Sequence, residues 1–313
     1  MNPKLKSVHI GWRSRFAVWL MRKLLRPWLA WVVRGPLDRI ARIQLFVSGR
    51  RCRDSSGLPL AYRVVGKVPG HVLGSLKDTH KPAILYLHGG AFILPASPEQ
   101  HARLVGRMCR DLDAVGFLPD YRLAPVNRFP AALDDCERAY RALLDLGFDP
   151  ARIVLAGESA GGNLVLGLLQ RIRKHGWPMP ACAIPISPGT EMGRLHGPRS
   201  RTSRMKSDPI LPAAALHRVS ELYIGNWDTS DPELSPLYAD LTGFPPMYLL
   251  VSDNEILLDD TLLFAERLRD ARLPFELDIW PILPHAFPVL EMWLPEAAQA
   301  RKDMVTFMRK HVK

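Results

Sequence analysis

The stretch Ile153-Val154-Leu155-Ala156-Gly157-Glu158-Ser159-Ala160-Gly161-Gly162 decides the fold that we predict for this chain. An apolar run leads straight into Gly157, and a helix-compatible run over 163–169 follows Gly162. A G-x-S-x-G pattern between a strand and a helix is typical of a tight turn that projects a serine from the end of the strand. The start of the helix also directs free N–H groups and a positive dipole end toward that point. The pattern therefore predicts a nucleophilic role for Ser159.

Around this turn, short apolar runs alternate with amphipathic stretches from about residue 83 onward. We expect buried strands over 83–87, 114–118, 153–156, 181–186 and 247–251, and a last strand over 275–280. We expect helices over 98–112, 131–146, 160–175, 257–271 and 295–310. Such alternation is typical of βαβ units. It predicts the α/β class, with a mostly parallel, doubly wound sheet that carries helices on both faces.

A second loop, Tyr86-Leu87-His88-Gly89-Gly90-Ala91-Phe92, follows the strand expected over 83–87. Glycines in such a loop allow backbone N–H groups to approach a substrate carbonyl closely. We therefore expect the amides of Gly89 and Gly90, together with that of Ala160, to form an oxyanion hole. We expect His88 to hold this loop in place rather than to act as a base.

A serine is a weak nucleophile until a base removes its proton. His285 lies in Pro281-Ile282-Leu283-Pro284-His285-Ala286-Phe287, directly after the last expected strand. The chain order of serine, acid and histidine is typical of hydrolases built on such a sheet, so His285 is the predicted base. Two carboxylates, Asp253 and Glu255, follow the strand expected over 247–251, and either could orient His285. Asp253 could alternatively cap the helix that follows.

These elements resemble the bacterial hormone-sensitive-lipase family of α/β-hydrolases over about residues 80–290. The resemblance extends to further motifs, namely Asp120-Tyr121-Arg122-Leu123-Ala124-Pro125, Phe129-Pro130-Ala131-Ala132, Ser235-Pro236-Leu237 and Gly243-Phe244-Pro245-Pro246. Two positions depart from the family pattern. Ala91 stands where a third glycine is common, and Glu158 precedes the serine where Asp or Thr is usual. Neither departure removes a catalytic atom.

The resemblance implies hydrolysis of carboxylic esters through an acyl-enzyme, with short- to medium-chain acyl groups as the substrate class. The family marks its acid by the pattern D-x-L-x-D, and Glu255-Ile256-Leu257-Leu258-Asp259 fits this pattern with Glu in the first position. The fit favours Glu255 over Asp253 as the acid. Two alternatives stay open: an amidase or deacetylase that uses the same residues, and a non-catalytic ligand-binding relative, because a fold alone does not decide function.

Positive charge is concentrated at the N-terminus. Residues 1–53 contain 13 Lys and Arg against one acid, Asp38, so this segment has a formal charge of +12 within a total of +11. The body therefore has no excess positive charge to attract an anionic substrate. Apolar runs over 16–21 and 28–33 are too short to span a bilayer, and cations separate them. We expect an amphipathic helix here that Pro27 kinks or ends.

Two compatible interpretations of this segment are a helix that caps the active site and a peripheral anchor on a membrane surface. Nucleic-acid binding is not expected, because no recognition motif accompanies the basic residues. The four cysteines are scattered without the spacing of a metal site. We expect neither a metal nor an organic cofactor, because a serine, a histidine and an acid supply both proton transfer and covalent catalysis.

We therefore divide the chain into a basic cap or membrane-surface segment, 1–53, and an α/β-hydrolase catalytic domain, 54–313. The stretch over about 193–246 interrupts the alternation of strands and helices, and we expect a cap insertion there with one helix near 212–223. The expected partners are a small-molecule ester, a membrane surface and a second copy of the chain in a homodimer. The expected location is the cytoplasm, with membrane association through the first segment.

Overall fold

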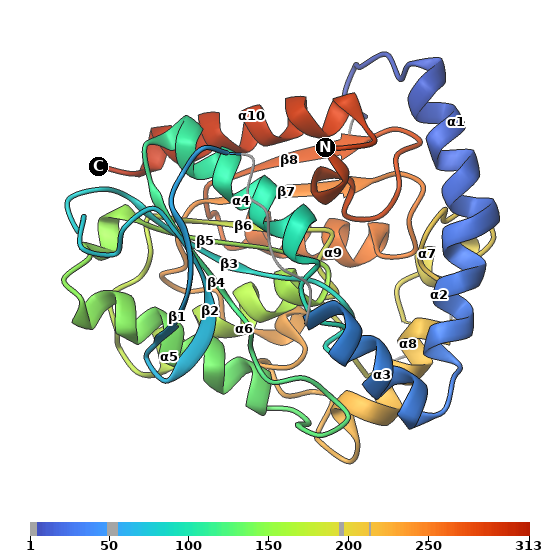
Figure 1. Cartoon of the computed structure of the whole chain (residues 1–313), viewed down its shortest axis with the longest axis horizontal. Helices are drawn as coiled ribbons and strands as arrows, with labels where there is room; N and C mark the ends of the chain where they lie inside the picture. The colour runs from blue at the N-terminus through green and yellow to red at the C-terminus, as the bar shows by residue number, and fades with distance from the viewer. Residues whose placement is uncertain (1–4, 49–55, 194–196, 213) are drawn as a thin grey trace.

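The computed structural model describes residues 5–48, 56–193, 197–212 and 214–313. These residues contain an eight-stranded sheet in the order β1-β2-β4-β3-β5-β6-β7-β8 (Figure 1). The strands are β1 (Leu60–Val65), β2 (Val68–Leu73), β3 (Ala83–Leu87), β4 (Val115–Pro119), β5 (Ile153–Glu158), β6 (Cys182–Ile186), β7 (Met247–Ser252) and β8 (Phe275–Trp280). Strands β3 to β8 pair in parallel, whereas β2 pairs antiparallel with β1 and β4. The predicted α/β architecture with a mostly parallel sheet is confirmed.

The six predicted strands are β3 to β8, and their ends agree with the prediction within two residues. The hairpin of β1 and β2 was not predicted. Its two-residue turn consists of Gly66 and Lys67, with φ angles of 59° and 68°. Positive φ angles at both positions are typical of the tight turns that join antiparallel strands.

The five predicted helices are also present, with ends within one residue of the prediction: α4 (Pro98–Leu112), α5 (Ala131–Asp145), α6 (Ala160–Lys174), α9 (Leu258–Asp270) and α10 (Pro295–His311). They cover both faces of the sheet. Along β3, Ala83, Leu85 and Leu87 pack into the core with α5, α6 and α9. Ile84 and Tyr86 pack into the core with α4 and α10. This alternation follows from the two-residue period of a strand and explains why β3 is apolar throughout.

The N-terminal segment forms α1 (Trp12–Leu20), a π-helical turn η1 (Met21–Leu25), α2 (Arg26–Val33) and α3 (Leu37–Ser48). The expectation that Pro27 could end the first helix is wrong, because the chain stays helical from α1 through α2. The π turn lies directly before Pro27, which then falls in the first turn of α2. The wider π turn accommodates the proline ring and its missing N–H group, so the helix continues past Pro27.

The insertion between β6 and β7 contains α7 (Ser200–Ser203), α8 (Ala214–Val219), a π turn η3 (Ser220–Ile224) and a 3₁₀ turn η4 (Pro236–Tyr238), while η2 (Pro150–Arg152) and η5 (Phe287–Leu290) lie outside it. The helix expected near 212–223 corresponds to α8 and η3. Figure 1 shows the N-terminal helices beside α7 and α8 at one end of the sheet. The Arg26 guanidinium donates to the Met205 carbonyl at 2.5 Å, and that of Arg218 donates to the Gly35 carbonyl at 3.0 Å.

These hydrogen bonds join the N-terminal segment to the insertion, and the division of the chain into a cap and a catalytic domain stays a prediction. The boundary at residue 53 stays a prediction, because residues 49–55 lie outside the described part of the chain.

Candidate active site

Ser159 lies in the turn between β5 and α6, at the carboxyl end of a central strand. Its backbone has φ 57° and ψ −119°, which is a sparsely populated conformation for a residue with a side chain. The positions on either side of Glu158-Ser159-Ala160 have no room for a side chain. A Cβ added at Gly161 would lie 1.8 Å from the Leu87 carbonyl oxygen, and one added at Gly157 would lie 2.5 Å from the same atom. Glycine is therefore required at both positions, and the strand-to-helix turn predicted from the motif is present.

His285 lies in the loop after β8, beside Glu255 from the loop after β7. The Nδ1 atom of His285 is 3.1 Å from Oε1 of Glu255, and both side chains are buried. The other carboxylate oxygen of Glu255 accepts hydrogen bonds from Ser187 Oγ at 3.0 Å and from the Ser252 amide at 3.2 Å. The buried Nε2 atom of His285 has no hydrogen-bond partner among the described residues. His285 and Ser159 line the same cavity, which has a volume of about 250 Å³.

Asp253, the alternative acid, has a different partner. Its carboxylate accepts a hydrogen bond from the Ile282 amide at 2.8 Å and so anchors the loop that leads to His285. It does not cap the following helix, because α9 begins at Leu258 and its N-cap position is Leu257. Among the two candidate carboxylates, the structure brings only Glu255 to the imidazole.

The surroundings of His285 favour its charged form. Burial lowers the pKa of His285, but the charge and hydrogen bond of Glu255, with the charges of Asp208 and Glu158, outweigh burial and raise the pKa above its ordinary value. A cation at His285 is thus stabilised by three carboxylates. This is the charge state that a histidine acquires when it removes a proton from a serine.

Asp208 belongs to this site and was missed by the sequence analysis. It is fully buried and lies in the insertion. Its Oδ1 atom accepts hydrogen bonds from the Ile210 and Leu211 amides at 2.8 Å, and its Oδ2 atom accepts one from the Ile256 amide at 2.9 Å. Burial raises the pKa of Asp208. The carboxylate therefore ties the insertion to the loop that carries Glu255. The local signal was an Asp that accepts from amides two and three residues ahead, a pattern typical of turns.

The loop after β3 differs in part from the prediction. The Gly89 amide donates to the carboxylate of Glu158, so it is engaged inside the protein and the expectation that it faces a substrate oxygen needs correction. The amides of Gly90, Ala91 and Ala160 have no acceptor among the described residues. Ala91 has φ 58°, which turns the backbone sharply at this point. The three amides without a partner are those of Gly90 and Ala160, two of the three expected at an oxyanion hole, and that of Ala91.

His88 lies beneath this loop. Its Nδ1 atom is 2.7 Å from the Gly89 carbonyl oxygen, and its ring stacks on Tyr121 with 4.2 Å between the ring centres. Burial, with the charge of His101, lowers the pKa of His88 to about 4. A neutral, stacked ring matches the expectation that His88 holds the loop and is not a base.

Two cavities meet at Ser159. The first has a volume of about 60 Å³ and mostly apolar walls, lined by Phe92, Met192, Leu216, Val219, Ile224 and Leu257 among others. The second is the cavity of about 250 Å³ that contains His285, and its walls include Leu29 and Val33 of α2. Residues of the N-terminal segment thus line the cavity of Ser159.

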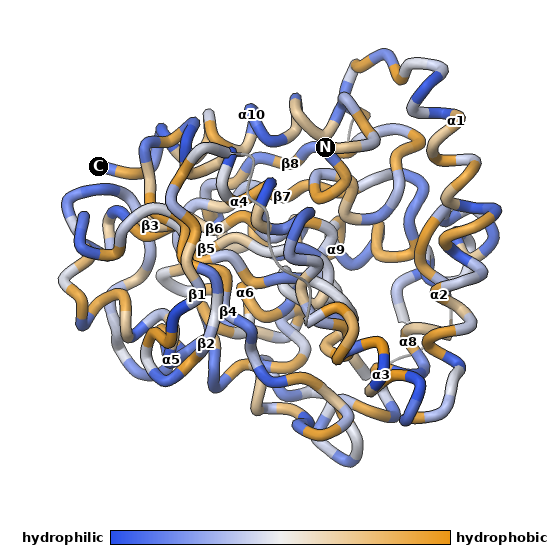
Figure 2. The backbone as a smooth tube through the Cα atoms, in the orientation of Figure 1, coloured by the Kyte–Doolittle hydropathy of each residue, from blue (hydrophilic) through white to orange (hydrophobic). Residues whose placement is uncertain are grey.

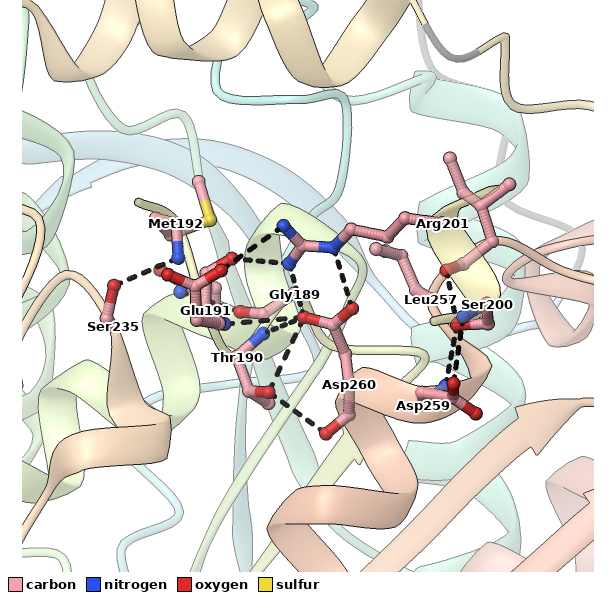
Figure 3. A network of polar contacts seen from close by, with 12 residues as sticks. Gly189, Thr190, Glu191, Met192, Ser200, Arg201, Ser235, Leu257, Asp259 and Asp260 are labelled. Atoms are coloured by element: carbon pink, nitrogen blue, oxygen red, sulfur yellow. Dashed lines mark hydrogen bonds and ion pairs between the residues drawn. The ribbon is translucent and has the colours of Figure 1, made fainter. Parts of the chain in front are cut away.

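A buried ionic network adjoins the narrow cavity (Figure 3). The guanidinium of Arg201, from α7, binds both carboxylate oxygens of Asp260 at 2.6 and 3.0 Å. The carboxylate of Glu191 lies 3.5 Å from the same guanidinium. Asp260 also accepts a hydrogen bond from the Thr190 amide at 2.9 Å. The network joins the loop after β6, the insertion and α9, and so fixes one wall of the narrow cavity.

A metal centre is not evident within the described ranges, because no group of three or more His, Cys, Asp or Glu side chains there could hold an ion. The geometry instead resembles the serine, histidine and acid arrangement of hydrolases that form covalent acyl intermediates. Fold and site together define a serine hydrolase with the α/β-hydrolase fold.

Comparison with known proteins identifies the family. The model of an alpha/beta hydrolase fold family matches residues 84–289. Esterase LipU of Mycobacterium tuberculosis is 36% identical over 282 residues, which cover 88% of this chain and 92% of that protein. An acetyl-hydrolase of Streptomyces hygroscopicus is 36% identical over 226 residues, or 72% of this chain and 75% of the relative.

Solved structures agree with these matches. A crystal structure of EstE5 soaked with p-nitrophenyl butyrate has a TM-score of 0.85 and 32% identity, and covers 96% of this chain and 99% of its own. A hormone-sensitive lipase from a metagenome library has a TM-score of 0.84 and 32% identity, with 98% and 100% covered. The chain belongs to the α/β-hydrolases of the bacterial hormone-sensitive-lipase type. It is a carboxylic ester hydrolase.

The pairing of Glu255 with His285 predicts a change in the pKa of the histidine. In Glu255→Gln the opposing charge is lost while burial remains, so the pKa of His285 should fall by about one pH unit or more. An NMR titration of the imidazole signals, with His285→Gln used for assignment, measures this pKa. Asp253→Asn is the matched control and should leave the pKa unchanged. A fall in Asp253→Asn without one in Glu255→Gln would contradict the pairing.

Proposed function

We propose that Ser159, His285 and Glu255 form the catalytic triad of this ester hydrolase. One observation carries the proposal: the only nucleophile in a strained strand-to-helix turn among the described residues shares a cavity with an imidazole that a buried carboxylate orients. His285 Nε2 takes the proton of Ser159 Oγ, which attacks the ester carbonyl. His285 then protonates the leaving alcohol, and water repeats these steps on the acyl group.

The oxyanion of each tetrahedral intermediate needs several N–H donors that are not already engaged. The amides of Gly90, Ala91 and Ala160 meet this condition among the described residues, whereas the Gly89 amide is held by Glu158. Ala160 also lies at the start of α6, where the helix dipole favours negative charge. These three amides are the proposed oxyanion hole.

Each of the two cavities receives one part of the substrate. His285 must reach the oxygen of the leaving alcohol, so the wider cavity, which contains His285, receives the alcohol. The narrow cavity then receives the acyl chain. Its volume of about 60 Å³ is well below the roughly 300–1,000 Å³ of common ligand pockets. Short acyl chains are therefore the proposed substrates.

The triad is tested by side-by-side variants on one short p-nitrophenyl ester. Ser159→Ala and His285→Ala should lower kcat by about 10⁶-fold, and Glu255→Ala by about 10⁴-fold. Asp253→Ala should retain most of the activity. A fluorophosphonate probe should label the wild type and not Ser159→Ala, as read by intact mass. Inactivity confined to Asp253→Ala would overturn the assignment of the acid, and an unlabelled folded wild type would overturn the nucleophile.

The acyl assignment is tested by a series of p-nitrophenyl esters of increasing acyl length. The rate constant kcat/KM should be highest for short chains, because each added methylene gains burial only while the narrow cavity has space. Met192→Ala enlarges this cavity and should move the optimum to longer chains. Leu290→Ala changes the wider cavity alone and should leave the acyl profile unchanged. The opposite response of the two variants would show that the cavities are assigned the wrong way round.

The N-terminal segment also offers a surface to a membrane, and we propose that it binds anionic phospholipid. Helices α1 and α2 bury Val18, Val32 and Val33 against the body. Their opposite face leaves large apolar side chains between 47% and 73% exposed: Trp12, Phe16, Trp19, Leu24, Trp28 and Trp31. So many large apolar side chains exposed on one side of a helix pair are typical of an interaction surface. Figure 2 shows apolar and polar colours alternating along α1 and α2 at the outer edge of the molecule.

Charge decides which apolar partner fits this face. Arg13, Arg15, Lys23 and Arg34 are exposed on the same helices, in a segment of formal charge +12. Two copies of so basic a surface would repel each other, whereas Trp, Leu and cationic side chains together are typical of helices that lie on anionic membranes. None of the described helices is long and apolar enough to cross a bilayer. A homodimer stays a prediction without a structural argument.

Vesicle binding tests the membrane proposal. The wild type should sediment with vesicles of phosphatidylglycerol and phosphatidylcholine, less with phosphatidylcholine alone, and less at high salt. Replacing Trp12, Phe16 and Trp19 by Ser should weaken binding at least about ten-fold. The matched control replaces Val64 and Val126, which are 69% and 85% exposed elsewhere, by Ser and should bind as the wild type does. Failure of the wild type to bind vesicles would contradict the proposal. So would self-association of the wild type that the triple substitution abolishes, because the apolar face would then bind a second copy of the chain.

A further inference from the structure

A buried polar cluster lies beneath the loop that supplies the proposed oxyanion hole. Glu158 ends β5, His101 lies on α4, and Gly89 is the second residue of the loop after β3. Glu158 is 3% exposed and His101 is 7% exposed. None of these side chains has a role in the proposed triad. They nevertheless join the nucleophile turn, the oxyanion loop and a helix in one set of contacts.

One carboxylate oxygen makes the connection. Oε1 of Glu158 accepts the hydrogen bond of the Gly89 amide and also lies 2.8 Å from Nε2 of His101. A Cβ added at Gly89 would lie 2.7 Å from this same oxygen, so the close approach requires glycine. The Gly89 amide lies in the peptide plane directly before that of the Gly90 amide, and the Gly89 carbonyl, which shares the plane of the Gly90 amide, lies 2.7 Å from His88 Nδ1. Anchoring the Gly89 amide therefore limits how far the start of the loop can move, and with it the next two amides.

The imidazole of His101 has a partner at its other nitrogen in both protonation states. Its Nδ1 atom lies 2.9 Å from the Ser97 amide nitrogen and 3.0 Å from the Ser97 carbonyl oxygen. A neutral ring can accept from the amide, and a cationic ring can donate to the carbonyl. Burial raises the pKa of Glu158, but the charge and hydrogen bond of His101 and the Gly89 amide outweigh it and lower the pKa. The carboxylate is therefore ionised and paired.

We infer that Glu158 and His101 are a positioning pair that holds the Gly89 peptide and thereby aims the Gly90 and Ala91 amides at the oxyanion. The inference rests on the proposed function, because it assigns the pair a purpose only if those amides bind the oxyanion. Length is essential to the contact. An Asp at position 158, the residue usual in similar enzymes, is shorter by one methylene and would withdraw the carboxylate from Gly89 or from His101.

The test compares Glu158→Asp, His101→Leu and His101→Gln with the wild type on one short p-nitrophenyl ester. A misdirected oxyanion hole weakens binding of the transition state and not of the substrate. Glu158→Asp and His101→Leu should therefore lower kcat about 10- to 100-fold while KM changes less than about three-fold. His101→Gln retains an N–H donor and should recover most of the rate lost in His101→Leu. Affinity for a boronic acid analogue of the tetrahedral intermediate should fall in parallel with kcat.

Controls separate positioning from folding. Glu233→Asp shortens another carboxylate and should leave kcat unchanged. Glu233 lies away from the active site, where it pairs with Arg171 at a distance of 2.6 Å. Thermal unfolding of every variant reports the folded fraction. Wild-type kcat in folded Glu158→Asp, or a loss of rate that only follows the unfolded fraction, would overturn the inference. If Glu158→Asp does not fold, the comparison of His101→Leu with His101→Gln tests the inference instead. Equal rates in these two variants would overturn the inference.

Fluorophosphonate labelling distinguishes failure of this inference from failure of the proposed function. If Ser159 is fully labelled in the wild type and the variants have unchanged kinetics, the positioning role is wrong and the triad stands. If the folded wild type is not labelled, the triad itself is wrong.

Discussion

The active site depends on one close approach between backbones, where the start of α6 meets the end of β3. A Cβ at Gly161 would lie 1.8 Å from the Leu87 carbonyl oxygen and 2.6 Å from that of His88. The absence of a side chain at this position lets the turn that contains Ser159 pack directly on the loop after β3. The strained backbone of Ser159 persists because the strand before it and the helix after it are buried almost throughout. Strain of about 1–3 kcal/mol is small beside the burial of two such elements.

Three buried carboxylates act on His285, and each has partners of its own. Glu255 contacts His285, Asp208 accepts three backbone amides, and Glu158 binds His101 and the Gly89 amide. A buried charge is tolerated only when it is paired or hydrogen-bonded. All three raise the pKa of His285. In the proposed mechanism, the imidazolium of His285 would therefore meet a negative field that is already in place, and little reorganisation would be needed when the charge appears.

The regular body of the fold could be predicted because its signals are local. Strands β3 to β8 are short apolar runs between helices, and their ends agreed with the sequence within two residues. Strand β2 was missed because Pro69 and Gly70 interrupt its apolar run, and β1 because it alternates little and is largely exposed. The motif at Ser159 and the position of His285 after the last strand likewise depend on nearby residues alone.

The parts of the site that were missed depend on residues far apart in the chain. No local pattern shows that Glu158 reaches the Gly89 amide 69 residues away, or that Asp208 reaches the Ile256 amide 48 residues away. The chemistry of a loop glycine depends on which carboxylate the fold brings to its amide. The number of glycines in the loop therefore indicates where an oxyanion hole lies, but the tertiary hydrogen bonds decide which amides remain available for it.

The N-terminal segment shows why two interpretations of one sequence can hold together. A helix has more than one face, and here Leu29 and Val33 line the cavity of Ser159 and His285 while Trp28 and Trp31 on the same helix are about half exposed. Composition alone could not separate a cap from a membrane surface, because both require apolar residues at helical spacing. The fold assigns each set of residues to its own side. If the outer face binds lipid as proposed, the lipid surface and the cavity lie on opposite sides of one helix.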